Sequence, residues 1–211
     1  MSQYEPSFTG KIKNTYQEST PSWPELPKAL GGPNVITIVF DDMGFAHPSC
    51  FGSEIPTPNI DSLAATGLRY TGFHTTALCS PSRASLLTGR NHHSVGMRGV
   101  SNWNTGFPNM RGGISPRAGT IAEVLRTQGY ATFCAGKWHL APMEECTAAG
   151  PHHNWPLQKG FDRFYGFLNG ETDQFYPELT QGNQHILPPR TPEEGYHLTE
   201  DLIDQSTTWI R

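Results

Sequence analysis

The chain has 211 residues, of which 15 are lysine or arginine and 19 are aspartate or glutamate, giving a formal net charge of −4. A chain of this length can enclose one ample core, and without a basic field it is not expected to bind nucleic acid. No stretch of about 18 apolar residues is present, which excludes a transmembrane helix on the usual length criterion, so no membrane partner is expected.

The cysteines and the N-terminal residues indicate the cellular compartment. The four cysteines are Cys50, Cys79, Cys134 and Cys146. They are too few and too scattered for a disulfide framework, and none forms a C-x-x-C pair. Residues 1–28 are polar and proline-rich, without the apolar segment of a secretory signal. We therefore expect a cytoplasmic protein.

The predicted elements begin after an N-terminal arm. Residues 1–33 contain several prolines and glycines and show no hydrophobic periodicity, so we interpret them as the arm. Residues 35–40 are almost continuously apolar and rich in β-branched side chains. This pattern predicts a strand buried on both faces of a parallel sheet.

A helix and a second strand are expected next. Residues 57–65 have Thr57 at the N-cap position and Pro58 in the first turn, which predicts a helix that ends at Gly67. Residues 68–73 are then a candidate strand.

The middle of the chain repeats this alternation. Residues 80–88 predict a helix that begins with a Ser-Pro pair and ends before a glycine. Residues 120–126 predict another helix, because Thr120 and Glu123 have the spacing of a capping box, and residues 130–135 predict a strand. Strands that alternate with helices indicate an α/β domain with a mainly parallel sheet.

Two long loops and the last helix complete the prediction. Residues 91–118 and 141–160 are rich in Gly, Pro, Asn and His, and loops of such length commonly build a site or a lid. From Thr199 onward, apolar residues recur at helical spacing up to the last residue, Arg211. Because no later segment covers that apolar face, we expect the chain to be the N-terminal part of a longer protein.

Two carboxylates follow the first predicted strand. Asp41 and Asp42 fall where open parallel sheets bind ligands, at the carboxyl end of a strand. Adjacent carboxylates repel each other unless a cation lies between them, which favours a metal. Taken alone, the dipeptide is more typical of a solvated turn.

Lys137 and His139 follow the third predicted strand, in the sequence Gly-Lys-Trp-His. Residues two apart in an extended chain point the same way, so a positive charge and a proton acceptor would lie side by side. In isolation, an exposed lysine and a packed histidine are the simpler interpretation.

The most specific pattern is the twelve-residue string C-S-P-S-R-A-S-L-L-T-G-R, which runs from Cys79 to Arg90. A free cysteine is most often buried, but the whole string resembles the signature of the type I sulfatases, in which this cysteine is oxidised to formylglycine. The Asp-Asp pair, the helix near residue 60 and the Gly-Lys-Trp-His sequence occur in the same order in that family. The resemblance covers residues 34–211, and the loops around the string look most like the bacterial arylsulfatase branch.

The resemblance implies an alkaline-phosphatase-like α/β/α sandwich with a mainly parallel sheet, incomplete at its C-terminus, in which residues 34–211 form the N-terminal part of the catalytic domain. It implies hydrolysis of a small-molecule sulfate ester, and maturation by a formylglycine-generating enzyme.

The resemblance also implies residue roles. Cys79 would supply the hydrated aldehyde, and Arg83 would hold it. Lys137 would neutralise charge on the sulfuryl oxygens, and His139 would deprotonate the second hydroxyl so that sulfate leaves. Ca²⁺, or another divalent cation, would be bound by Asp41 and Asp42 together with the modified Cys79.

Two alternatives stay open. A phosphate or phosphonate ester hydrolase of the same superfamily would keep the metal aspartates, and some phosphonate hydrolases also carry formylglycine. The chain could instead be an inactive, truncated product, since the family's second Asp-Asn metal pair and further His and Lys come from later sequence. Because Ca²⁺ takes about 6–8 oxygen ligands, we expect residues 1–211 alone to bind metal poorly and to turn over little substrate.

Overall fold

The computed structural model describes residues 8–23 and 31–211. Its centre is a four-stranded sheet in the order β1-β2-β3-β4. The strands are β1 (Phe133–Lys137), β2 (Arg163–Phe167), β3 (Leu179–Gln181) and β4 (Gln184–Ile186). β1 pairs parallel to β2, with Lys137 opposite Phe167, and the other two pairings are antiparallel. The α/β prediction is confirmed, but the sheet in the described part of the chain is mixed instead of mainly parallel, because only β1 and β2 pair in parallel.

The strands after β1 were not predicted individually, although their sequence explains them. In β2 every residue but the first is buried, so its run of aromatic side chains packs on both faces of the sheet. Between β3 and β4, Gly182 and Asn183 form a two-residue connection, and the φ of 59° at Gly182 suits the tight turn that joins twisted antiparallel strands.

The four helices are α1 (Pro58–Thr66), α2 (Cys79–Thr88), α3 (Ile121–Thr127) and α4 (Leu198–Ile210). All four were predicted within two residues of their ends. At the start of α3, both hydrogen bonds of the predicted capping box are present between Thr120 and Glu123. On α4, Leu202 and Trp209 pack against the sheet, whereas Ile203 and Ile210 remain exposed.

The two long loops contain only short 3₁₀ turns and isolated bridges besides irregular chain. These turns are η2 (His92–Val95), η3 (Met143–Glu145) and η4 (Pro156–Lys159). The strand expected at residues 130–135 begins three residues later, as β1.

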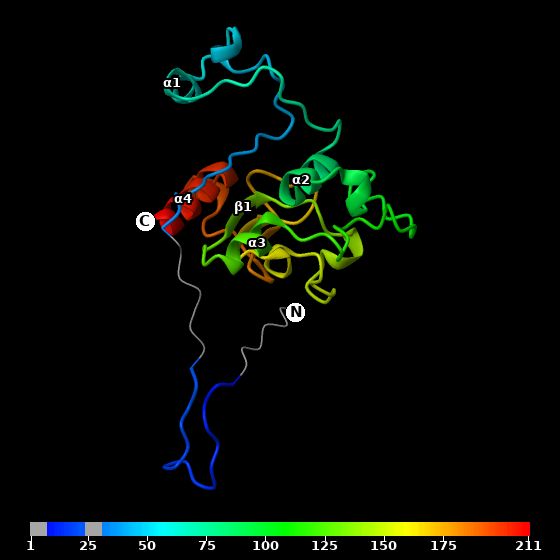
Figure 1. Cartoon of the computed structure of the whole chain (residues 1–211). Coiled ribbons are helices and arrows are strands. Elements are labelled where there is room, and N and C mark those ends of the chain that lie inside the picture. Colours follow the sequence, from blue (N-terminus) through cyan, green and yellow to red (C-terminus); the bar gives the residue numbers. More distant parts are fainter. Residues whose placement is uncertain (1–7, 24–30) are drawn as a thin grey trace.

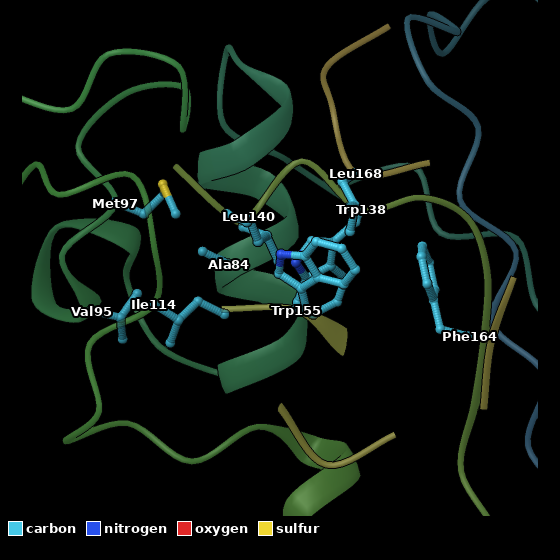
Figure 2. Close-up of a cluster of buried hydrophobic side chains, with 10 residues drawn as sticks. Ala84, Val95, Met97, Ile114, Trp138, Leu140, Trp155, Phe164 and Leu168 are labelled. Carbon is cyan, nitrogen blue, oxygen red and sulfur yellow. The ribbon is translucent and has the colours of Figure 1, made fainter. Parts of the chain in front are cut away.

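The larger hydrophobic cluster lies where α2, the long loops and the end of β1 meet (Figure 2). Trp138 and Trp155 are its largest members, and their indole N–H groups donate to backbone carbonyls at Asn154 and Glu145. A second cluster lies between the sheet and α4. Since Trp138 belongs to the first cluster, the residues on either side of it are held firmly.

The segment before α2 departs from the prediction. Residues 35–40 and 68–73 form no strand, and their apolar side chains are exposed, with 65% of Ile36 and 72% of Phe73 accessible to solvent. α1 buries no residue, and Figure 1 shows it apart from the body that contains the sheet. The predictions of a buried strand at residues 35–40 and of a strand at residues 68–73 were wrong, because an apolar pattern shows only what a segment could bury. It does not record whether neighbouring strands are available to cover it.

The predicted arm falls partly on residues 1–7 and 24–30, which lie outside the described residues. Between them, Lys11 and Thr20 form an isolated antiparallel bridge. In the described ranges, no helix has both the length and the apolar character needed to cross a bilayer.

Candidate active site

The backbone at the end of β1 fixes His139. The parallel pairing with β2 continues past the strand, because the N–H groups of Trp138 and His139 donate to the carbonyls of Phe167 and Leu168 at 2.9 and 3.0 Å. His139 has a φ of +53°, which non-glycine residues seldom adopt. Such a conformation persists only where the surroundings hold it, as these hydrogen bonds and the buried neighbours of His139 do.

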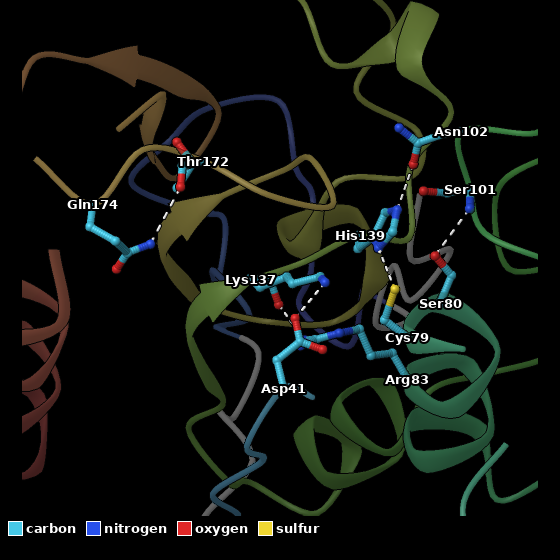
Figure 3. A network of polar contacts seen from close by, with 10 residues as sticks. All are labelled: Asp41, Cys79, Ser80, Arg83, Ser101, Asn102, Lys137, His139, Thr172 and Gln174. Carbon is cyan, nitrogen blue, oxygen red and sulfur yellow. Dashed lines mark hydrogen bonds and ion pairs between the residues drawn. The ribbon is translucent and has the colours of Figure 1, made fainter. Parts of the chain in front are cut away.

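Cys79 is the first residue of α2, and its sulfur faces the ring of His139. The distance from Cys79 Sγ to His139 Nδ1 is 3.0 Å (Figure 3). The next residue, Ser80, is fully buried, and its Oγ accepts a hydrogen bond from the backbone N–H of Ser101 at 3.0 Å. This bond ties the start of α2 to the loop that contains Ser101.

Arg83 lies one helical turn after Cys79, so the two side chains share one face of α2. Its Nη1 donates to the backbone carbonyl of Lys137 at 2.5 Å, and its Nη2 lies 3.9 Å from Asp41 Oδ2. The guanidinium is therefore anchored to the end of β1, and its side chain is only 16% exposed.

Asp41 lies between two cations. Its Oδ2 accepts a hydrogen bond from Lys137 Nζ at 2.5 Å, in addition to the longer ion pair with Arg83 (Figure 3). The Lys137 side chain is 10% exposed and that of Asp41 is 38% exposed. Two positive charges against one carboxylate leave a site suited to an anionic group.

Asp42 takes no part in this contact. It is exposed and has a φ of +53°, and no hydrogen bond or ion pair joins its carboxylate to the other predicted site residues in the described ranges. The structure thus brings together the side chains of Asp41, Cys79, Arg83, Lys137 and His139, and leaves the side chain of Asp42 out of their contacts.

The protonation state of His139 follows from its surroundings. Burial lowers the pKa of His139 to about 4, assisted by the positive charges of Lys137 and Arg83 and opposed by Asp41. The imidazole is therefore neutral at pH 7, and one ring nitrogen keeps a free electron pair.

Asn102, which no sequence motif marked, contacts the far side of the same ring. His139 Nε2 lies 2.5 Å from Asn102 Oδ1 (Figure 3). Asn102 belongs to the long loop 91–118, where an asparagine between turn residues has no motif to mark it. The only signal for a functional residue here was the general expectation that a loop of this length builds a site.

A divalent cation was expected at Asp41, Asp42 and Cys79. Carboxylate oxygens are suitable ligands for Ca²⁺, but two carboxylates supply only part of its usual shell. Asp41 is already ion-paired with Lys137, and Cys79 has His139 as its hydrogen-bond partner. No group of three or more His, Cys, Asp and Glu side chains is arranged to hold a metal in the described part of the chain. These residues alone therefore do not fit the ion.

The chain resembles known sulfatases over most of its length. The family model described as Sulfatase matches residues 33–211. The arylsulfatase of Klebsiella aerogenes is 31% identical over 189 residues, a match that covers 85% of this chain and 39% of the relative. Human arylsulfatase A is 41% identical over 166 residues, which cover 77% of this chain and 30% of the relative. The chain thus spans between 30% and 39% of the length of these relatives.

Solved structures agree with the sequence matches. The PsFucS1 sulfatase from Pseudoalteromonas sp. has a TM-score of 0.61 and 26% identity, covering 80% of this chain and 38% of its own. The structure of Ps i-CgsB has a TM-score of 0.60 and 27% identity, with coverages of 81% and 39%. The expected alkaline-phosphatase-like fold class is therefore confirmed.

Proposed function

The chain belongs to the sulfatase family, and from this premise we propose that it forms the N-terminal part of the catalytic domain of an arylsulfatase-type enzyme, which hydrolyses sulfate esters through a formylglycine made from Cys79. The single observation that carries the proposal is the 3.0 Å contact between Cys79 Sγ and His139 Nδ1, one helical turn from Arg83.

The surroundings of Cys79 fit the modified residue. Cys79 is the first residue of α2. Its side chain is half-buried and faces a neutral imidazole that can accept a proton. When formed, the hydrated aldehyde supplies one hydroxyl that attacks sulfur and a second hydroxyl through which sulfate is released. The thiol of an unmodified cysteine lacks that second group.

Arg83 and Lys137 divide the electrostatic work. Arg83 lies on the same helix face as residue 79, where a guanidinium can stabilise negative charge on that residue's oxygen. Lys137 presents an ammonium group for the non-bridging oxygens of the ester. The contact with Asp41 holds this ammonium in place while it awaits substrate.

His139 handles the proton. In its neutral form, Nδ1 is placed to accept the proton of a hydroxyl carried by residue 79, because the distance to the side chain at that position is already that of a hydrogen bond. Burial lowers its pKa most, and with the charges of Lys137 and Arg83 it keeps the imidazole neutral between turnovers.

Metal binding, the substrate and the maturation partner belong to the whole protein. We propose that Asp41 and Asp42 contribute to a divalent-cation site that other residues complete, and that a formylglycine-generating enzyme acts on Cys79. A phosphate or phosphonate ester is the second candidate substrate, since Arg83 and Lys137 provide charges that would also attract the oxygens of a phosphoryl group.

The decisive experiment is mass analysis of the tryptic peptide of residues 70–83 from protein made with a formylglycine-generating enzyme. We expect an aldehyde in place of the thiol, and faster turnover of nitrophenyl sulfate than of nitrophenyl phosphate by the whole protein. His139→Gln should lower kcat by about 10²–10⁴-fold with the aldehyde still present. Full activity with an unmodified thiol would overturn the role of formylglycine, and a preference for the phosphate ester would overturn the substrate class.

A further inference from the structure

We propose that Asn102 is a positioning residue that determines which ring nitrogen of His139 carries the proton. The inference rests on the proposed function, because it explains how His139 Nδ1 is kept free to accept a proton from residue 79. Neither the family match nor the sequence motifs point to this asparagine.

The argument begins with the two contacts of the ring. Nδ1 faces Cys79 Sγ at 3.0 Å, and Nε2 faces Asn102 Oδ1 at 2.5 Å. An amide oxygen can only accept a hydrogen bond, so Nε2 must carry the proton in this arrangement. A neutral imidazole has one N–H group, and Nδ1 is consequently left with its electron pair, directed at residue 79.

The loop that supplies Asn102 is anchored to the start of the same helix as Cys79. The preceding residue, Ser101, is 1% exposed and donates its backbone N–H to Ser80 Oγ. Ser80 in turn follows Cys79 directly. The residue to be deprotonated and the residue that orients the base are therefore tied together through one buried hydrogen bond.

The ring is also confined from a second direction. A methyl group built on Gly170 would come within 2.7 Å of His139 Cε1, so the backbone at Gly170 lies against the imidazole. His139 is only 5% exposed, but Asn102 itself is exposed, so any water that takes the place of its side chain comes from bulk solvent and has no fixed orientation. Removal of the Asn102 oxygen should therefore leave Nε2 without a fixed acceptor, and the proton free to occupy either nitrogen.

The direct test is the ¹⁵N NMR spectrum of the histidine rings in the ¹⁵N-labelled 211-residue chain at neutral pH. The resonances of His139 are identified by their loss in His139→Gln. We expect the Nε2–H tautomer in the parent chain, a mixture of tautomers in Asn102→Ala, and recovery of the Nε2–H form in Asn102→Asp, which keeps an oxygen acceptor. Asn109→Ala, at an exposed position of the same loop, is the matched control.

Two results would overturn the proposal. One is an Nδ1–H tautomer in the parent chain, and the other is an unchanged Nε2–H tautomer in Asn102→Ala, with the backbone amide spectrum showing that each variant is folded. Because this readout needs neither formylglycine nor turnover, it can fail while the sulfatase activity stands, and the reverse also holds.

A kinetic experiment in the matured whole protein connects the tautomer to catalysis. Asn102→Ala should lower kcat by about tenfold to a hundredfold and change KM little, and Asn102→Asp should restore most of the loss. Equal losses in the two variants would contradict a role through the acceptor oxygen.

Discussion

The body of the molecule, from α2 to α4, and the segment of residues 31–78 before it both contain many apolar residues. They differ in how far those side chains are buried. Among the described residues, the buried hydrophobic side chains of the core lie between Ala84 and Leu198, whereas the apolar side chains of residues 35–40 are exposed. In residues 31–43, no backbone–backbone hydrogen bond is found in the described structure. The difference teaches that an apolar segment becomes buried only where neighbouring strands form hydrogen bonds with its backbone N–H and C=O groups.

The segment of residues 31–78 nevertheless contributes one side chain, that of Asp41, to the site. Asp41 reaches Lys137 and Arg83 although the residues before it form no strand. The contact that places Asp41 at the site is thus electrostatic, while Lys137, Arg83 and His139 are placed by packing and by backbone hydrogen bonds.

The largest expected effect is the loss of stability on replacing a phenylalanine by alanine, which should be large in the body and small in the segment of residues 31–78. Phe164 in β2 is 1% exposed, and Phe73 is 72% exposed. Phe164→Ala should lower the free energy of unfolding by about 3–5 kcal/mol, because it empties a close-packed site. Phe73→Ala should change it by less than about 0.5 kcal/mol. Urea titration checks both values, and equal losses would show that the segment is packed like the body; Phe164→Leu serves if the alanine variant does not fold.

A smaller effect concerns how well the body excludes water from His139. Its folded-state pKa of about 4 lies below the ordinary value of 6.5, so between these pH values the unfolded chain binds the extra proton. Stability should therefore fall as the pH is lowered from 6.5 to 4, by up to about 3 kcal/mol from this group. His139→Gln should remove that part of the pH dependence, measured by denaturant titration across the range. His74→Gln, in the exposed segment, is the control for loss of an imidazole.

The smallest effect on stability should come from Asp41→Asn. Since its carboxylate is partly exposed, the loss should be less than about 1 kcal/mol. Cleavage by a protease specific for aromatic residues should, however, become faster at Phe40 and Phe45, because the ion pairs that tether the segment are gone. The experiment is done with a chelator, and Asp42→Asn is the matched control. Similar cleavage of the two variants would show that Asp41 does not hold the segment.

The sequence predicted the helices well because local signals specify them. The capping box at Thr120 and Glu123 and the Ser-Pro start of α2 depend on neighbours within one turn. It also predicted that Lys137 and His139 would come after a strand. The strand is present as β1, displaced toward the C-terminus, so Lys137 is its last residue and only His139 lies beyond it.

The remainder depended on contacts that are distant in the chain. Whether residues 35–40 pair is decided by the availability of a neighbouring strand, which no local pattern records. Asn102 lies 37 residues before His139, and the loop that carries it is held by Ser80, so its role follows only from the folded arrangement. The predicted pair of Asp41 and Asp42 is not found as a pair in the site. Asp41 is ion-paired with Lys137 and Arg83, whereas the carboxylate of Asp42 contacts none of the other site residues in the described ranges.

The edge position of β1 has a consequence for how the chain behaves in concentrated solution. β1 pairs with β2 on one side and ends the described sheet on the other, so its second row of backbone groups has no strand beside it. Asp41 brings the exposed, hydrogen-bond-free residues 35–40 to the end of that strand. An open edge and an apolar extended segment are the features through which strands of separate molecules join. The solubility of this chain should therefore be limited by concentration-dependent self-association, even under conditions in which its core is fully folded.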